Sequence, residues 1–227
     1  MTTTFDVAVV GATGVVGAAM LEILAERKFP VGKVHALASE RSVGKKVEFG
    51  NRELVVSDLA EFDFSSVQIG LFSAGGSISA EFAPKAAAAG CVVIDNTSHF
   101  RYDDDVPLVV PEVNADKIAD YGNRGIIANP NCSTIQMVVA LAPLHRAAGI
   151  ARINVATYQS VSGAGRRGMQ ELAAQTALGM ATYESRPRAL AAPGETSSPS
   201  TRIHSCSLSY LQIGSYSMFV FEPPFSM

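Results

Sequence analysis

The segment Phe5-Asp-Val-Ala-Val-Val10, together with the turn Gly11-Ala-Thr-Gly14-Val-Val-Gly17 that follows it, sets the architecture of this chain. The first part predicts a short buried strand, and residues 18–27 after the turn have amphipathic helical spacing. Strand, glycine turn and helix in this order are the context that a dinucleotide-binding fingerprint requires. The glycines allow a tight turn and close approach to a pyrophosphate, which the helix N-terminus attracts. Because the spacing is G-x-x-G-x-x-G and not the commoner G-x-G-x-x-G, an ordinary strand-to-helix turn stays open as an alternative.

The end of the next predicted strand, residues 34–38, bears on which dinucleotide is bound. A site for NAD usually ends this strand with an acidic residue that binds the ribose hydroxyls. Here Ser39, Arg41 and Ser42 follow a small alanine, and a guanidinium with two hydroxyls suits the 2′-phosphate of NADP. We therefore expect NADP. Glu40 is the alternative, because it would be the ribose ligand if the strand ended one or two residues away from the predicted position.

Strand and helix candidates alternate along the first two-thirds of the chain. Segments of these lengths in this order predict a doubly wound, mostly parallel α/β sheet of the Rossmann type. The strand candidates are residues 5–10, 34–38, 67–72, 91–95, 108–110, 125–129 and 153–160, and the helix candidates are residues 17–27, 79–89, 115–120, 133–147 and 166–178.

Polar and glycine-rich loops follow two of the predicted strands. These loops are Ser73-Ala-Gly-Gly76 and Asp95-Asn-Thr-Ser98. Since ligands of such sheets bind beyond the carboxyl ends of the strands, both loops are expected to face the cofactor. Ordinary turn chemistry is the alternative for any single residue in them.

Cys132 lies where a predicted strand meets a predicted helix, in Asn129-Pro-Asn-Cys132-Ser-Thr134. In the first turn of a helix, unpaired N–H groups and the positive end of the dipole favour thiolate over thiol. The same N–H groups can hold an oxyanion that forms beside the sulfur. This is how a cysteine is prepared to attack a carbonyl carbon. The local context alone leaves a buried structural thiol equally open, and the glycine turn favours the nucleophile.

Composition narrows the class of protein. A chain of 227 residues with 48% hydrophobic and 17% charged residues is typical of a globular protein of one large or two small domains. A net charge of −3 gives no reason to expect nucleic acid as a partner. No basic N-terminal region precedes a long apolar run, and no stretch reaches membrane-spanning length, so neither secretion nor membrane insertion is expected. The cysteines Cys91, Cys132 and Cys206 lack metal-ligand spacing and leave an odd thiol, which predicts no metal and a reducing cytoplasm.

Taken together, these motifs resemble the aspartate-semialdehyde dehydrogenase family. N-acetylglutamyl-phosphate reductases and glyceraldehyde-3-phosphate dehydrogenases, which share the chemistry, look less similar around the cysteine. The resemblance covers residues 5–178 and rests on several ordered segments. They are Val10-Gly-Ala-Thr-Gly14-Val-Val-Gly17, Ser73-Ala-Gly-Gly76, Asp95-Asn-Thr-Ser98-His-Phe-Arg-Tyr102, Val109-Val-Pro-Glu-Val-Asn114, Asn129-Pro-Asn-Cys132-Ser-Thr134 and Thr157-Tyr-Gln-Ser-Val-Ser-Gly-Ala-Gly165.

The resemblance implies NADPH-dependent reduction of β-aspartyl phosphate to aspartate semialdehyde and phosphate in amino-acid biosynthesis, by a homodimer or homotetramer. Cys132 would form a thioester that hydride then reduces, and Gln159 would orient the substrate. Arg101 and Asn131 would bind the phosphate group. A loop amide and a solvated surface arginine are the plain alternatives for Gln159 and Arg101. The implied cofactor-binding residues are Gly11, Thr13, Gly14, Val15, Gly17, Ser39, Arg41, Ser42, Ser73, Gly75, Asn96, Ser162 and Gly163.

The likeness stops near residue 179, and this sets the expected domains. We expect an NADP-binding domain over residues 1–130, the start of an incomplete α+β substrate domain over 131–178, and an atypical tail over 179–227. From Met180 onward there is no Lys, Asp or Asn, which suggests a truncation or a change of reading frame. The family's acid/base histidine and carboxylate-binding arginine have no matching segment, and His204 does not take that role. Low activity is therefore expected, and the alternatives are a non-catalytic dinucleotide-binding remnant or a module that a partner subunit completes.

Overall fold

The computed structural model describes residues 3–184 and 216–220 of the chain. The described residues form two compact units; the chain passes from the first to the second between Thr157 and Tyr158, and returns to the first between Tyr216 and Ser217. The predicted boundaries at residues 130 and 178 stay predictions.

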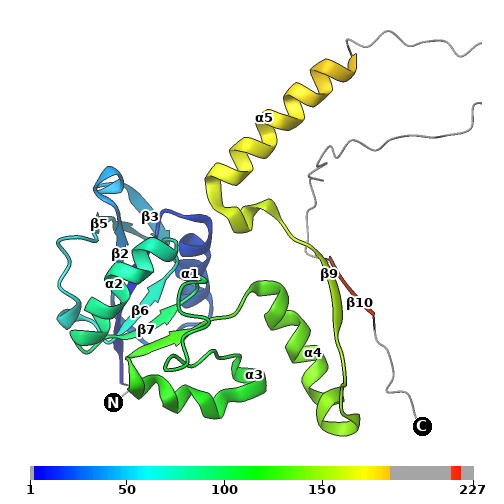
Figure 1. Cartoon of the computed structure of the whole chain (residues 1–227). Coiled ribbons are helices and arrows are strands. Elements are labelled where there is room, and N and C mark those ends of the chain that lie inside the picture. Colours follow the sequence, from blue (N-terminus) through cyan, green and yellow to red (C-terminus); the bar gives the residue numbers. More distant parts are fainter. Residues whose placement is uncertain (1–2, 185–215, 221–227) are drawn as a thin grey trace, which may run out of the picture. The chain divides into compact units, whose positions relative to one another are not determined.

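A parallel sheet of six strands forms the body of the first unit (Figure 1). Its strands stand in the order β5-β2-β1-β6-β7-β8, and all neighbours pair in parallel. The chain therefore runs outward from β1 in both directions, and the carboxyl ends of β1 and β6 flank the point where the order reverses. The strands are β1 (Phe5–Val10), β2 (Val31–Ala38), β5 (Ser57–Asp58), β6 (Ile69–Phe72), β7 (Val92–Asp95) and β8 (Ile126–Ala128).

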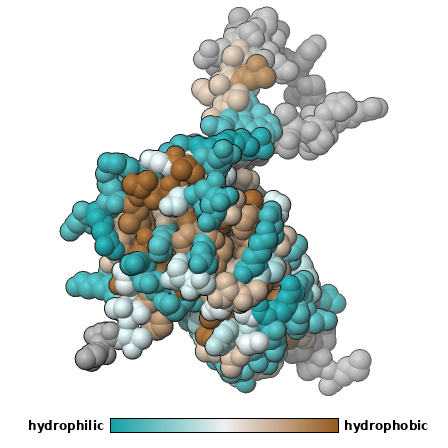
Figure 2. Space-filling model, turned by 90° about the vertical axis from the view of Figure 1, so that its left-hand side faces the viewer, coloured by the Kyte–Doolittle hydropathy of each residue, from teal (hydrophilic) through white to brown (hydrophobic). Residues whose placement is uncertain are grey.

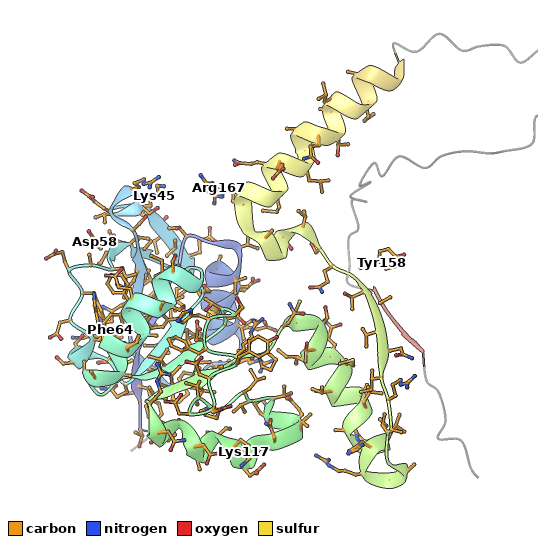
Figure 3. All side chains as sticks on the ribbon, viewed as in Figure 1. Lys45, Asp58, Phe64, Lys117, Tyr158 and Arg167 are labelled. Atoms are coloured by element: carbon orange, nitrogen blue, oxygen red, sulfur yellow. The ribbon has the colours of Figure 1, made fainter. Side chains whose placement is uncertain are left out.

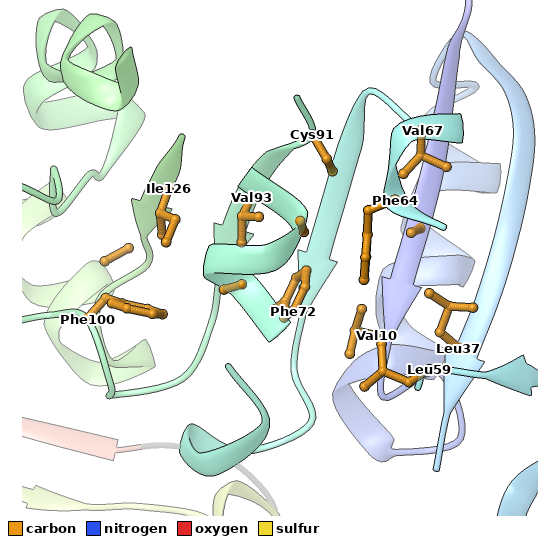
Figure 4. Close-up of a cluster of buried hydrophobic side chains, with 14 of the residues drawn as sticks. Val10, Leu37, Leu59, Phe64, Val67, Phe72, Cys91, Val93, Phe100 and Ile126 are labelled. Atoms are coloured by element: carbon orange, nitrogen blue, oxygen red, sulfur yellow. The ribbon is translucent and has the colours of Figure 1, made fainter. Parts of the chain in front are cut away.

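Both faces of this sheet are buried, as alternate residues of β1 show. Val7 and Val9 belong to one apolar cluster, which includes Leu21 of helix α1 (Val15–Glu26). Val10 belongs to the other cluster, which includes residues of helix α2 (Gly76–Ala88) and is drawn in Figure 4. Strands buried on both faces are the mark of a doubly wound α/β sheet, so the predicted fold class is confirmed.

The aromatic rings of the second cluster pack in a row. The Phe64 and Phe72 ring centroids lie 6.0 Å apart in a stacked arrangement, and Phe62 meets Phe64 edge-on at 5.2 Å. Phe64 belongs to a short 3₁₀ segment, η2 (Phe64–Ser66), which the Asp63 carboxylate caps by accepting from Ser65 N–H at 3.0 Å. Such stacked and edge-on ring contacts stabilise the cluster beyond the burial of the rings themselves.

Three short strands between β2 and β6 were not predicted. The antiparallel hairpin of β3 (Lys46–Phe49) and β4 (Arg52–Val55) turns at Gly50, whose φ is +59°, and β5 adds an edge to the main sheet. β3 alternates charged and apolar residues over only four positions, and β4 has two charged residues followed by two apolar ones, so neither strand carries a periodic signal long enough to recognise.

Two predicted elements are wrong. The expected strand at 108–110 contributes only an isolated parallel bridge between Leu108 and Ala128, because prolines 107 and 111 flank it and lack the N–H that a ladder needs. The expected helix at 115–120 is a 3₁₀ segment, η3 (Ala115–Asn123), that continues the short helix α3 (Pro111–Asn114). Proline at the first helical position starts α3 without losing a hydrogen bond.

The remaining elements follow β8. Helix α4 (Cys132–Ala148) leads to β9 (Asn154–Tyr158), which pairs with β10 (Tyr216–Val220) in a separate two-stranded sheet. The 3₁₀ segment η4 (Val161–Ala164) and helix α5 (Gly165–Glu184) come next.

Side chains of both polarities cover the described surface. In the view of Figure 2, hydrophilic side chains spread over most of the face, and hydrophobic ones gather toward one area of it. Among the described helices, none is both long and apolar enough to cross a membrane.

Candidate active site

The glycine turn lies against the loop that follows β6. Gly11 has φ +89°, a conformation that favours glycine, and its N–H donates to the carbonyl of Leu37 at 2.8 Å. A Cβ atom on Gly11 would stand 3.0 Å from the backbone nitrogen of Ala74. Because β1 and β6 are parallel neighbours, the turn and Ser73 lie at the same end of the sheet, and glycine at position 11 lets the two loops touch there.

These loops line a cavity of about 600 Å³ at the carboxyl ends of β1, β2 and β6. Its position is the one where ligands of doubly wound sheets bind. The structure thus brings five of the predicted cofactor residues together, since Gly11, Thr13, Gly14, Ser39 and Ser73 all line it. The other lining residues are Ala38, Glu40, Asp58, Leu59, Ala60, Ala74, Ile78 and Phe82.

The remaining cofactor predictions in the first unit lie outside this lining. Arg41 and Ser42 belong to a 3₁₀ segment, η1 (Glu40–Ser42), directly after Ser39. Val15 and Gly17 lie in the first turn of α1. Gly75, with φ +99°, caps α2, and Asn96 follows β7.

Two carboxylates in the cavity bear on the choice of dinucleotide. β2 ends at Ala38, as predicted, so Ser39 follows it directly, yet Glu40 also lines the cavity. The second carboxylate, Asp58 (labelled in Figure 3), was missed because the two-residue strand β5 leaves no periodic pattern. One Asp58 oxygen accepts from Ala60 N–H at 3.0 Å.

Cys132 is the first residue of α4, as predicted, and its side chain is exposed. The N-cap is Asn131, whose side-chain oxygen accepts from Ser133 N–H at 3.0 Å. The Cys132 sulfur lies 4.0 Å from the same Asn131 oxygen. The Ser133 hydroxyl is buried without a hydrogen-bond partner among the described residues. An exposed thiol at a capped helix N-terminus has the environment of a reactive cysteine.

Cys91 is a buried thiol, in contrast to the exposed thiol of Cys132. Its side chain is 1% exposed, and burial raises the pKa of the thiol from 9.0 to about 11. We expect iodoacetamide at pH 8 to label Cys132 and to spare Cys91 until the protein unfolds. Trypsin separates the two thiols, because it releases Cys132 in the peptide 125–146, so mass spectrometry can read each one. Equal labelling of both native thiols would contradict this.

The raised pKa of Cys91 also has a consequence for stability. The folded state holds the thiol proton more tightly than the unfolded chain does. This contribution to the free energy of unfolding is therefore complete below pH 9 and is lost as the pH rises toward about 11.

Arg101 is half-buried and tied to two loops. Its Nε donates to the carbonyl of Asn129 at 2.9 Å, and its Nη2 donates to the carbonyl of Asn96 at 3.1 Å. The side-chain Nδ2 of Asn129 donates to Oδ1 of Asn96 at 2.6 Å. Arg101 is therefore held by protein carbonyls and is not a freely solvated arginine. The part played by Asn129 was not predicted, because it depends on a contact between residues distant in sequence.

A buried carboxylate anchors the same region. Asp95, at the end of β7, is 0% exposed. One of its oxygens accepts from the hydroxyl of Ser79 in α2 at 2.8 Å and from Thr97 N–H at 3.1 Å, and the other accepts from the Thr97 hydroxyl at 2.7 Å. These bonds fasten the loop that carries Asn96 and Arg101 to the first turn of α2.

The other predicted residues belong to the second unit. Gln159 follows β9, and Ser162 and Gly163 lie in η4. Ser160 caps that segment, since its hydroxyl accepts from Ser162 N–H at 3.3 Å. The roles of Gln159, Ser162 and Gly163 stay predictions. His204 and most of the predicted tail lie outside the described residues.

Among residues 3–184 and 216–220, no group of three or more His, Cys, Asp or Glu side chains could hold a metal ion.

The comparisons with known proteins agree on one family. Residues 6–121 match the model "Semialdehyde dehydrogenase, NAD binding domain", and residues 141–201 match "Semialdehyde dehydrogenase, dimerisation domain". Aspartate-semialdehyde dehydrogenase 2 of Vibrio cholerae is 64% identical over 177 residues, which are 78% of this chain and 52% of that protein. Aspartate-semialdehyde dehydrogenase of Legionella pneumophila is 65% identical over 75% of this chain and 49% of its own length.

Solved structures give the same result. The aspartate semialdehyde dehydrogenase II of Vibrio cholerae "complexed with ASA" matches with a TM-score of 0.75 and 63% identity, over 78% of this chain and 52% of that one. The aspartate semialdehyde dehydrogenase of Candida albicans "with NADP" matches with a TM-score of 0.57 and 29% identity, over 71% and 52%. The chain spans about half the length of the curated relatives that it matches.

Proposed function

This chain belongs to the aspartate-semialdehyde dehydrogenase family, and from that premise we propose that it serves the NADPH-dependent conversion of β-aspartyl phosphate to aspartate semialdehyde and phosphate. The observation that carries the proposal is the exposed Cys132 thiol at the start of α4, in a segment whose Asn129 carbonyl holds Arg101. A nucleophile and an anion-binding guanidinium are the two groups that attack on an acyl phosphate requires.

In this proposal Cys132 gives up its thiol proton to water and attacks the acyl carbon of the substrate as the thiolate. A carbon–sulfur bond forms, the bond from that carbon to the phosphate oxygen breaks, and inorganic phosphate leaves with the electron pair. Arg101 and Asn131 bind the phosphate group and stabilise the charge that it carries away. The first N–H groups of α4 stabilise the oxyanion that forms on the acyl carbon during the attack. Gln159 orients the resulting thioester.

The glycine turn fits a nicotinamide dinucleotide. A Cβ on Gly17 would stand 2.2 Å from the Gly11 carbonyl oxygen, so the close-packed turn accepts only glycine there and leaves its backbone open to a pyrophosphate. Thr13, Gly14 and Ser73 hold the dinucleotide, with Ser162 and Gly163 near its nicotinamide. When bound, NADPH supplies the hydride that reduces the thioester.

We propose NADP and not NAD as the cofactor because of the residues that follow β2. Ser39 lines the cavity, and Arg41 and Ser42 stand two and three positions further along. A guanidinium beside hydroxyls suits a 2′-phosphate, whereas Glu40 and Asp58 in the same lining suit ribose hydroxyls.

Arg41→Ala is expected to weaken NADP binding about tenfold and to leave NAD binding unchanged, because only NADP carries the phosphate that the guanidinium would pair with. Isothermal titration calorimetry with each dinucleotide measures the two affinities. Arg27→Ala, an exposed arginine at the other end of α1, is the matched control. Equal losses for both dinucleotides would contradict a 2′-phosphate contact.

The proposal also covers the compartment and the oligomeric state of the protein. The free thiols of Cys91 and Cys132 suit a reducing cytoplasm, and a homodimer or homotetramer is in keeping with the match to a dimerisation domain. Turnover by the 227-residue chain alone is proposed to be weak or absent. The reason is that residues 180–227 contain no segment like the family's acid/base histidine or carboxylate-binding arginine segments.

Phosphate-dependent reduction of NADP with aspartate semialdehyde, followed at 340 nm, tests the function. Turnover that disappears in Cys132→Ala supports the reaction, and His204 is then the next residue to change. Activity only after mixing with a complete family subunit would favour a module that a partner completes. Cofactor binding and substrate-protected alkylation of Cys132 without turnover would favour a non-catalytic remnant.

A further inference from the structure

Asn129 links two parts of the proposed site. One is Arg101, the proposed phosphate-binding arginine, and the other is the segment that leads into Cys132. Its side-chain amide donates to Oδ1 of Asn96 at 2.6 Å, across the carboxyl ends of the adjacent strands β7 and β8. Its carbonyl accepts from Arg101 Nε at 2.9 Å, and its own N–H donates to the Asp95 carbonyl at 2.8 Å. A single asparagine, just after β8, thus contacts the end of β7, the first residue of the loop that follows β7, and the guanidinium of Arg101.

Asn96 completes the arrangement from the other side. Its N–H donates to the carbonyl of Phe72 in β6 at 2.9 Å, and its own carbonyl accepts from Arg101 Nη2 at 3.1 Å. The guanidinium is therefore held by two backbone carbonyls, each on a residue anchored to the sheet through its N–H. The amide–amide bond between Asn96 and Asn129 links those two residues directly.

The direction of the guanidinium depends on how the carbonyls of Asn96 and Asn129 are oriented relative to each other. Because its N–H donors form a rigid fork, a change in the direction of either carbonyl turns the whole fork. Both carbonyls lie just beyond the strand ends. The peptide of the Asn96 carbonyl is held through Thr97 N–H, which donates to the Asp95 carboxylate at 3.1 Å, whereas the Asn129 carbonyl is joined to Pro130, which has no N–H to hold it. The side-chain bond from Asn129 to Asn96 restrains the second carbonyl relative to the first. With Nε and Nη2 engaged, Arg101 keeps Nη1 without a protein partner among residues 3–184 and 216–220, which leaves it for an anion.

Asn129 also lies close in sequence to the proposed nucleophile, Cys132. Asn129 precedes Pro130, whose ring restricts the backbone, and Asn131 then caps α4 before Cys132. The two carbonyl anchors of Arg101 thus lie on the β7 loop and on the segment that leads into the nucleophile's helix.

We propose that Asn129 is a positioning residue that aims the Arg101 guanidinium at the phosphate group of the substrate, through its amide bond to Asn96. The inference rests on the proposed function, since it takes a phosphate beside Cys132 as the ligand. Asn129 itself touches neither the thiol nor the substrate.

Protection of Cys132 by inorganic phosphate tests the inference without needing turnover. The full chain is treated with iodoacetamide over a series of phosphate concentrations at constant ionic strength, and labelling is read from the tryptic peptide 125–146. In Asn129→Ala, half-protection is expected to need about ten times more phosphate, while the labelling rate without phosphate stays the same. Arg101→Ala should remove the protection. Asn51→Ala, at an exposed turn, is the matched control and should behave as the unaltered chain.

The outcomes separate the inference from the proposed function. Protection of the unaltered chain, lost in Arg101→Ala but unchanged in Asn129→Ala, would overturn the inference alone. A change of about tenfold in the phosphate-free labelling rate of Asn129→Ala, as large as the change expected in half-protection, would also overturn the inference. Asn129 would then support the thiol loop and not the guanidinium. Absence of phosphate protection in the unaltered chain would overturn the proposed phosphate site and the inference with it.

Discussion

Gly17→Ala is expected to lower the free energy of unfolding by about 3 kcal/mol and to abolish dinucleotide binding. A Cβ at this position would stand 2.2 Å from the carbonyl oxygen of Gly11 and 2.8 Å from Cα of Ala12. Both contacts are with backbone, so no side chain can rotate away. Gly17 is in the first turn of α1, and the strain would fall on the turn that the pyrophosphate approaches.

Helix propensity alone predicts the opposite sign, since alanine favours a helix over glycine by about 1 kcal/mol. Urea unfolding followed by circular dichroism, together with calorimetry of NADP binding, therefore decides between the two effects. Gly122→Ala is the matched control, because a Cβ there meets no atom within 4 Å. A Gly17→Ala protein as stable as the control would show that the turn relaxes, which would contradict its close packing.

Asp95→Ala should lower the free energy of unfolding by about 3 kcal/mol, the range for breaking a buried, hydrogen-bonded charge. Asp95 is 0% exposed and accepts from the Ser79 hydroxyl and from both donors of Thr97. The substitution leaves the buried hydroxyl of Ser79, also 0% exposed, without its acceptor. Asp95→Asn keeps the shape and one acceptor oxygen, so its loss should be smaller.

The urea midpoint measures this effect. Asp104→Ala, an exposed aspartate in the same loop region, is the control and should change the midpoint little. Phosphate protection of Cys132 should weaken in Asp95→Ala as well, because the loop that carries Arg101 is fastened through Thr97. An Asp95→Ala protein with an unchanged midpoint would mean that the region is stable without its buried carboxylate.

The sequence predicted those parts of the site that depend on neighbours along the chain. The strand and glycine turn at residues 5–17, the end of β2 at Ala38 and the place of Cys132 in the first turn of α4 were all predicted and are confirmed. Each depends on a pattern of a few consecutive residues: a buried apolar run, glycines at a tight turn, or a strand-like segment that leads into an apolar helical one.

The elements that were missed or wrong lack such a pattern. The strand β5 has two residues, too few for any periodicity, so the place of Asp58 in the cofactor cavity was not predicted. The apolar segment at 108–110 reads as a strand, but its flanking prolines limit it to one bridge. Local propensity is a weak guide where the backbone partners lie elsewhere in the chain.

The residue identities were enough to establish the family and to predict the nucleophile and the dinucleotide turn, because those depend on side-chain chemistry and short-range geometry. What holds Arg101 depends on folding. Asn96 and Asn129 are 33 positions apart, and Ser79 and Asp95 are 16 apart. Asn96 and Asn129 meet because the parallel strands β7 and β8 have their carboxyl ends side by side. Ser79 reaches Asp95 because helix α2 begins just beyond the carboxyl end of β6, the neighbour of β7. At this end of the sheet the polar groups beyond the ladders must find partners in one another.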